Sequence, residues 1–193
     1  MEEFKPLAKS GPNRLPWIYY EMLVNLVNEI HKEEDIEKIR QKTVICVFLS
    51  LSLIETFINI YFRLFAEKIN DANKRIQLIE EINKRGIDWK IDNWPVLQKI
   101  DYGQGIGQKF QNLKKLRNDL VHYKPTYERV EVPGFAMEGL TDTAVYDFLN
   151  KDDAFNFLET AENFIGEIIC IGDGMTKDLI KHSLHFWLGR VPR

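Results

Sequence analysis

The chain has 193 residues, of which 45% are hydrophobic and 28% charged, a balance that excludes a disordered protein and fits one globular domain of ordinary size. The formal net charge of −3 excludes a strongly basic, histone-like protein, although local patches can still be basic. The two isolated cysteines, Cys46 and Cys170, exclude a disulfide framework and predict buried, reduced thiols in an intracellular protein. Because the charged N-terminus lacks the apolar stretch of a secretory signal, we expect a cytoplasmic location.

Apolar residues at helical spacing predict helices over the first half of the chain. Residues 1–15 contain Gly and Pro breakers and are expected to be an irregular lead-in. A first helix is predicted over 16–32 and a long second helix over 35–69. A third helix is predicted over 72–85, with Gly86 as its C-terminal cap.

The second half of the chain alternates helices with irregular segments. Residues 86–107 are expected to be a connector, in which Gly103, Gly105 and Gly107 form a flexible approach to the next helix. That fourth helix is predicted over 109–123, ending near Pro125 because proline disfavours helical geometry in the residue before it. Residues 126–150 are expected to be an irregular insertion with a short hairpin. The last two helices are predicted over 152–171 and around 176–187.

Long amphipathic helices with short connections predict an all-α fold, an up-and-down helical bundle in a single domain over 1–193. Its four core helices are expected to be the first, second, fourth and fifth. The third helix and the insertion would then be appended to the bundle.

Residues 44–65 are apolar enough to raise the alternative of a membrane span. Glu55 and Arg63 interrupt this stretch, and charged side chains are costly inside a bilayer. A central bundle helix, apolar nearly all round because other helices surround it, is therefore the preferred interpretation, and no membrane partner is expected.

The fourth helix carries polar residues close to its apolar stripe. Arg117 lies one turn after Leu113, and Asn118 and His122 are four residues apart and share a face. Arg117 and His122 are about 140° apart around an ideal helix, so they are expected to flank one groove. The stripe itself comprises Phe110, Leu113, Leu116 and Leu120.

This helix is also basic. Residues 109–124 contain five basic residues and one acidic residue, a net charge of +4. Such a patch is what a phosphate-contacting surface needs, and it predicts RNA as a partner. The predicted RNA-binding residues are Lys114, Lys115, Tyr123 and Lys124. For the lysines, an ordinary solvated helix face is the alternative.

The chemistry of an arginine and a histidine at one site suits RNA cleavage. A histidine in the last turn of a helix can donate or accept a proton near neutral pH. An arginine can bind a phosphate and stabilise the charge that develops on it. Together Arg117 and His122 can promote attack of an RNA 2′-hydroxyl on its neighbouring phosphate, so we expect no metal site and no cofactor.

The sequence "LRNDLVHYKP" at the end of a basic helix, after the apolar helix that includes "LIETFINIYF", resembles the HEPN domain family (higher eukaryotes and prokaryotes nucleotide-binding). The family signature is an arginine, then usually a polar residue, then a histidine about four to six residues after the arginine. Here these are Arg117, Asn118 and His122. The resemblance implies an all-helical homodimer, often a metal-independent endoribonuclease whose composite site forms between two subunits.

One branch of the family has a tyrosine two residues after the histidine, which an antitoxin enzyme modifies. This chain differs, since Tyr123 follows His122 directly and Lys124 occupies the other position. The resemblance thus implies a toxin or defence setting and an antitoxin or inhibitor protein as partner, without that modification.

A polar line crosses the apolar second helix at steps of three and four, through Ser52, Glu55, Asn59 and Arg63. A buried carboxylate needs a partner, and we expect Glu55 to meet Arg117. In the functional interpretation, Glu55 and Asn59 support the site by orienting Arg117. In the structural interpretation they form a pair that fixes the helix register.

Two functions remain open from the sequence. In the first, the protein is a dimeric HEPN-type endoribonuclease that leaves a 2′,3′-cyclic phosphate. Its catalytic residues would be Arg117, His122 and Asn118. In the second, it is a noncatalytic module that binds RNA or a nucleotide, or that assembles as a dimer.

Overall fold

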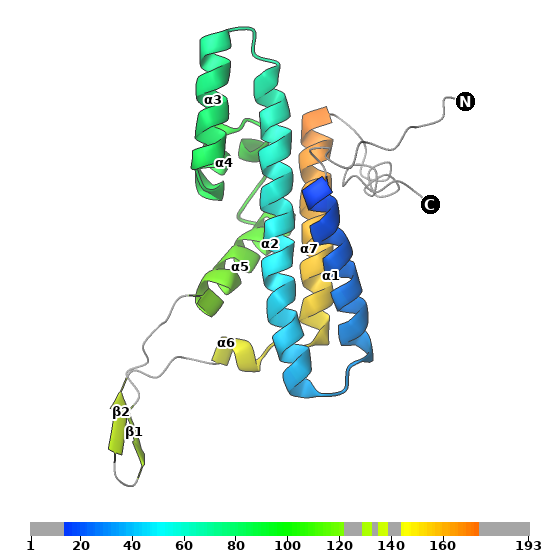
Figure 1. The fold of residues 1–193 in the computed structure, drawn as a ribbon, viewed down its shortest axis with the longest axis vertical. Coiled ribbons are helices and arrows are strands. Elements are labelled where there is room, and N and C mark those ends of the chain that lie inside the picture. Colours follow the sequence, from blue (N-terminus) through cyan, green and yellow to red (C-terminus); the bar gives the residue numbers. More distant parts are fainter. Residues whose placement is uncertain (1–13, 122–128, 133–134, 139–143, 174–193) are drawn as a thin grey trace, which may run out of the picture.

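A computed structural model describes residues 14–121, 129–132, 135–138 and 144–173 (Figure 1). Within these ranges the protein is an all-α helical bundle, as predicted, with one added two-stranded hairpin. The predicted sixth helix, at 176–187, lies outside the described residues, as does the lead-in up to residue 13.

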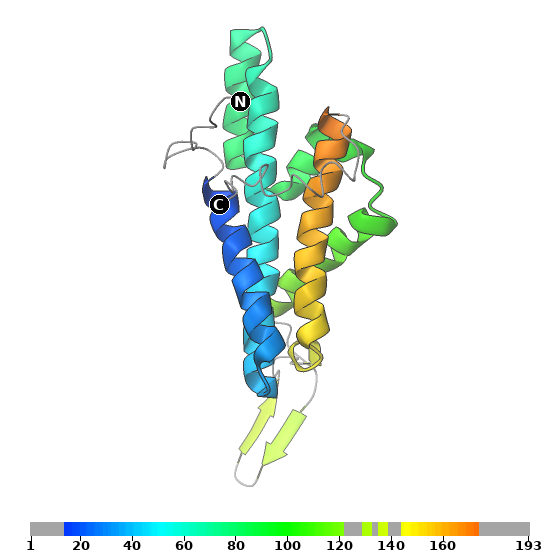
Figure 2. The same cartoon turned by 90° about the vertical axis from the view of Figure 1, so that its right-hand side faces the viewer.

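Three long helices form the body of the bundle. They are α1 (Arg14–Lys32), α2 (Ile36–Glu67) and α7 (Lys151–Asp173), and each packs against the other two. Their axes run side by side in both views (Figures 1 and 2). The fully buried side chains of α2 and α7, among them Ile54, Ile58 and Phe164, belong to one continuous hydrophobic core.

The helix α2 is the central element, because it contacts α1, α3, α5 and α7. It begins at an N-terminal cap, where the Asp35 carboxylate accepts hydrogen bonds from the backbone N–H groups of Glu37 and Lys38. By length and composition it is the one helix among the described residues that could cross a membrane. Since 56% of its apolar window is buried in the bundle, it fits the central helix expected from the sequence.

The region after α2 differs from the predicted connector. The helix α3 (Ala72–Lys84) packs against α2, and Ile82 is its buried contact. Arg85 then adopts an extended conformation, and Gly86 lies at the N-terminal cap of a further short helix, α4 (Ile87–Asn93). The expectation that Gly86 caps the end of the third helix is therefore wrong. A single 3₁₀ turn, η1 (Leu97–Lys99), follows α4.

The helix α5 (Gly105–Val121) begins four residues earlier than predicted. Two glycines in its first turn, Gly105 and Gly107, are required there for steric reasons. Gly105 has φ +58°, a left-handed conformation that favours glycine. A Cβ atom at Gly107 would come within 2.2 Å of the Asp101 carbonyl oxygen, so only glycine lets the loop pack this closely.

Stacked aromatic rings fix α5 against α7. The ring centroids of Phe110 and Phe164 are 4.2 Å apart, and Tyr102 lies against both rings. Figure 2 shows α5 crossing on the side of α7 away from α1. The first, second, fourth and fifth predicted helices thus correspond to α1, α2, α5 and α7, which form the core of the bundle as expected.

The predicted insertion contains regular structure. Its hairpin pairs β1 (Arg129–Val132) with β2 (Phe135–Glu138) in antiparallel register, where Val132 lies opposite Phe135. The short helix α6 (Ala144–Asp147) then packs near α2, where the Tyr146 hydroxyl donates a hydrogen bond to Glu37. The short hairpin expected from the sequence is confirmed.

Cys46 and Cys170 form no disulfide with each other in the described residues. Cys46 is fully buried, and burial raises the pKa of its thiol to about 12, so it is an unreactive core side chain. Cys170 is only partly buried, which differs from the buried position expected for both.

Candidate functional site

The apolar, buried face of α5 is followed by polar residues at the C-terminal end of the helix. Phe110 and Leu113 are buried on this face, and Leu116 and Leu120 are partly buried beside it, which confirms the predicted stripe. Arg117 lies one helical turn after Leu113 and two turns after Phe110, so it continues the line of buried side chains along α5. Its side chain is 32% exposed. The arginine therefore stands at the edge of the core, where solvent reaches it.

Arg117 meets the central helix through the predicted acid. The Arg117 Nη1 and Glu55 Oε1 atoms are 3.6 Å apart, which confirms the expected pair. The Glu55 side chain is 36% exposed, so this carboxylate lies at the rim of the bundle rather than in its interior as expected. Arg117 also donates a hydrogen bond of 3.2 Å from Nε to the Asn118 Oδ1 atom. Asn118 thus holds one edge of the guanidinium plane.

A third charged residue near this pair was missed by sequence reasoning. Lys90 lies on α4, and only 6% of its surface is exposed. Burial lowers the pKa of Lys90, and the nearby Glu55 carboxylate partly offsets this effect by favouring the charged ammonium. The one ion pair of Glu55 in the described residues is therefore with Arg117 of α5, and its charge also acts on Lys90 of α4 without a hydrogen bond or close ion pair. A lysine in an apparently irregular connector gave no periodic signal from which its burial could be predicted.

The predicted RNA-binding lysines of α5 do not join Arg117. Lys114 is buried, its ammonium pairs with Asp88 of α4, and it lies 5.8 Å from the centre of the Phe110 ring. Lys115 is exposed, but two residues along a helix place it about 160° from Arg117. A surface that uses Lys115 would thus face away from Arg117, and Lys114 is occupied by its own acid.

The polar line on α2 faces outward. Ser52 is partly buried, Asn59 is exposed, and Arg63 pairs with Glu67 on the same helix at 3.3 Å. Only Glu55 of this line meets α5 through a polar contact in the described residues. The support for Arg117 expected from Asn59 is therefore not seen here.

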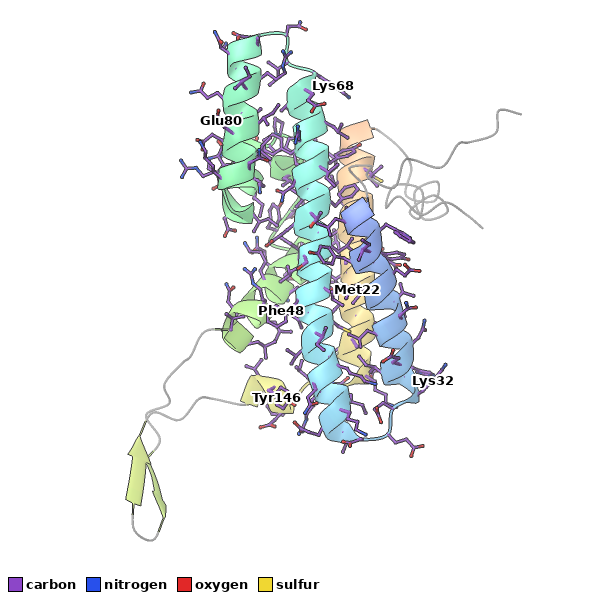
Figure 3. The ribbon with its side chains drawn as sticks, in the orientation of Figure 1. Met22, Lys32, Phe48, Lys68, Glu80 and Tyr146 are labelled. Atoms are coloured by element: carbon purple, nitrogen blue, oxygen red, sulfur yellow. The ribbon has the colours of Figure 1, made fainter. Side chains whose placement is uncertain are left out.

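Exposed apolar residues continue the same face of α2 below the polar line. Phe48 lies two turns before Glu55 and is 36% exposed, and Ile45 is 48% exposed. Figure 3 shows Phe48 on the part of α2 beside α5. Val121, one turn after Arg117 on α5, is 55% exposed. The Glu55–Arg117 pair therefore lies between exposed polar and exposed apolar surface.

The remaining predicted site residues, His122, Tyr123 and Lys124, lie outside the described residues. In sequence, His122 directly follows Val121, the last residue of α5. Within the described ranges, no group of three or more His, Cys, Asp or Glu side chains is placed to hold a metal ion. The site as described consists of Arg117 and Asn118 of α5 and Glu55 of α2.

Comparison of the chain with protein-family models, with curated proteins and with solved structures found no match. The chemistry of the site is therefore inferred from its own residues.

Proposed function

We propose that the protein is a metal-independent endoribonuclease of the HEPN type. The observation that carries the proposal is Arg117, a half-buried arginine at the end of α5 whose guanidinium is oriented by Asn118 and only loosely paired with Glu55. Its terminal nitrogens make no hydrogen bond within the described residues. A guanidinium in this state can bind two oxygens of a phosphate at once.

The proposed reaction is cleavage by an internal nucleophile. His122 takes the proton of the RNA 2′-hydroxyl, and the resulting oxygen attacks the adjacent phosphorus atom. The bond from phosphorus to the 5′-oxygen of the next nucleotide breaks, and that oxygen leaves with a proton. The products are a 2′,3′-cyclic phosphate and a 5′-hydroxyl, with no change in oxidation state and no water consumed in this step.

Arg117 supplies the electrostatic part of this mechanism. Negative charge accumulates on the non-bridging phosphate oxygens as the 2′-oxygen attacks, and a fixed cation beside them lowers the barrier. Asn118 keeps the guanidinium in one orientation, which reduces the cost of ordering it at the moment of reaction. Glu55 holds Arg117 in place when no RNA is bound.

The setting is proposed from the resemblance alone. A cytoplasmic homodimer would bring two copies of the motif together, and the exposed Phe48 and Val121 are available for such an interface. A toxin or defence role, with an antitoxin or inhibitor protein as partner, would follow from the RNA-cleaving activity.

The experiment is cleavage of a single-stranded RNA in excess EDTA. We expect the parent protein to cut it and the Arg117→Ala and His122→Ala variants not to cut it. The matched control is Arg85→Ala, which removes an exposed arginine that pairs with Glu81 on α3, away from the site. A parent that binds RNA but leaves it intact would overturn the nuclease and favour the noncatalytic binding module. Equal activity in parent and Arg117→Ala would overturn the assigned site.

A further inference from the structure

The hairpin of β1 and β2, here called the arm, stands clear of the helices. Figures 1 and 2 both show it beyond the end of the bundle at which α6 lies. The helix α6, which begins shortly after β2 in the sequence, is fastened to α2 by two contacts. The Tyr146 hydroxyl donates to Glu37, and Arg40 Nη2 donates to the Asp147 carbonyl oxygen at 2.7 Å. The arm is therefore followed by a helix that is held firmly on the bundle.

The arm has one apolar face. In its antiparallel register, Val130 lies opposite Met137 and Val132 lies opposite Phe135. Because alternate residues of a strand belong to the same face, these four residues share one face of the arm. One basic and two acidic residues, a net charge of −1, belong to the other face, which comprises Arg129, Glu131, Ala136 and Glu138. A sheet of only two strands is marginally stable in water, so the apolar face needs a surface to pack on.

The end of the bundle beside α6 has uncovered apolar side chains. Phe148, directly after α6, is 80% exposed, Ile36 at the start of α2 is 65% exposed, and Phe155 near the start of α7 is 59% exposed. These are the three most exposed large apolar side chains in the part of the chain that the structure describes. Their gathering at one end of the bundle, here called the bundle end, marks an interaction surface.

Charge favours a protein over a nucleic acid as the partner of these two surfaces. The arm has a net charge of −1, and the residues next to the bundle end in the sequence include the carboxylates Glu37, Asp147, Asp152 and Asp153. Neither surface has the excess of basic residues with which proteins bind phosphates. Both surfaces belong to the same chain and do not meet within it, so a second copy of the chain offers each of them a complement.

The apolar area is sufficient for a dimer if the contact is made twice. At on the order of 100 Å² of buried surface for each of the seven apolar residues, one arm on one bundle end would bury about 700 Å². A twofold axis repeats the contact. The total would then be about 1,400 Å², within the range of about 1,200–2,000 Å² that is typical of stable interfaces.

We propose that the arm of one chain packs its apolar face on the bundle end of a second copy, whose own arm does the same in return. The extended arm and the uncovered bundle end are then the two halves of one exchanged contact. This contact is separate from the surface of Phe48 and Val121 beside Arg117. It goes beyond the proposed function, since it does not depend on RNA cleavage.

The test of the partner is crosslinking between two variants that each carry one new cysteine. Affinity-tagged Met137→Cys is mixed with untagged Phe148→Cys and treated with a bis-maleimide that reaches about 10 Å, the spacing of packed layers. We expect a covalent dimer with one chain of each kind. The matched control replaces Phe148→Cys with Ile76→Cys, an exposed apolar position on α3, and should give no such dimer.

The double variant Met137→Cys/Phe148→Cys distinguishes exchange from an arm that folds back on its own bundle. Exchange predicts covalent dimers from this variant. Crosslinks confined to single chains would overturn the inference, and so would the absence of an arm-to-bundle crosslink in both experiments.

The dimer dissociation constant, measured by analytical ultracentrifugation, tests the face of the arm. Met137→Glu places a charge on the apolar face and should raise the constant at least about tenfold. Ala136→Glu places the same charge on the opposite face, one residue away, and should leave the constant within about twofold of the parent value. Equal constants for the two variants would overturn the inference.

The failure of this inference is distinguishable from the failure of the nuclease. A protein that forms the arm-to-bundle crosslink but leaves RNA intact would overturn the nuclease and keep the exchange. A protein that cleaves RNA but forms no such crosslink would overturn the exchange and keep the nuclease.

Discussion

Two clusters of charged residues on α2 differ in their ratio of acidic to basic side chains. Near the start of the helix, Lys42 pairs with two carboxylates of α1 and the following turn, Glu33 at 3.3 Å and Glu29 at 3.5 Å. Further along the helix, Glu55 pairs with Arg117 at 3.6 Å, and its charge also favours the ammonium form of Lys90, a residue that is only 6% exposed. The first cluster has one base for two acids, and the second has one acid for two bases.

The pKa values of the two lysines report the same difference. Burial would lower the pKa of Lys42, but hydrogen bonds to Glu33 and Glu29 outweigh it and the pKa is raised. Burial lowers the pKa of Lys90, and Glu55 offsets this only in part. The Lys42 cluster is satisfied within the protein and joins α1 to α2. At Lys90 the effect of burial outweighs the attraction of Glu55, so this lysine is not matched by a paired acid within the described residues.

The largest effect is expected for Arg117→Ala. Removing a group that stabilises the developing charge on phosphate should lower kcat/KM for RNA cleavage by about 100- to 1,000-fold. Thermal stability should change little, because the ion pair that is lost is half-exposed and weak. Steady-state cleavage in EDTA and a thermal melt measure the two quantities. Lys42→Ala is the contrast: it should cut RNA as the parent does, and a comparable loss of activity would remove the distinction between the clusters.

A smaller effect, on stability, is expected for Glu55→Gln. Lys90 would then lose the favourable charge of Glu55, so the free energy of unfolding should fall, by less than about 1 kcal/mol because Glu55 is 36% exposed and makes no hydrogen bond to Lys90. Urea denaturation at neutral pH measures it. In the Lys90→Met background the same change should cost much less, because the stranded ammonium is gone. Equal costs in the two backgrounds would show that Lys90 and Glu55 do not interact.

The pH dependence of stability should separate the two lysines. The pKa of Lys90 is lowered in the folded protein, so the cost of its charge is largest at neutral pH and disappears as the pH rises through that lowered value towards 10.5. The stability of the parent relative to Lys90→Met should therefore increase with alkaline pH.

The pKa of Lys42 is raised, so its contribution to stability is complete below 10.5 and is lost as the pH rises through the raised value. Melting temperatures of parent, Lys90→Met and Lys42→Met against pH test both signs, and the same slope for both variants would be contrary to this account.

The smallest effect is expected on the stability that the Glu33 carboxylate of the Lys42 cluster contributes, which depends on pH. The hydrogen bond from Lys42 lowers the pKa of Glu33, so this carboxylate contributes stability above its ordinary value of 4.5 that is lost as the pH falls through the lowered value. Lys42→Met removes this contribution. The difference in melting temperature between parent and variant should be small at neutral pH and vanish in acid. A difference that grows in acid would contradict the pairing.

The sequence carried enough information for the main helices and for one contact across the site. Regular apolar spacing located α1, α2, α3, α5 and α7 to within a few residues. The Glu55–Arg117 pair was predictable because a lone carboxylate in an apolar helix needs a cation, and Arg117 is the residue that extends the buried face of a neighbouring helix.

The rest of the site depends on tertiary contacts that leave no local pattern. The helix α4 has seven residues, too few for a clear apolar period, so its existence and the burial of Lys90 were not predictable. Lys114 looked like a surface cation because its partner, Asp88, is distant in the sequence. Gly86 looked like a helix end because glycine is common there, although here it precedes a helix.

The central claim is that Arg117 serves metal-free cleavage of RNA, and the chemical identity of the product ends tests it most directly. Mass spectrometry of an RNA cut in excess EDTA should show 2′,3′-cyclic phosphate and 5′-hydroxyl ends with the parent protein and intact RNA with Arg117→Ala. Ends bearing a 5′-phosphate, cleavage that requires added Mg²⁺, or the same products from Arg117→Ala would contradict it.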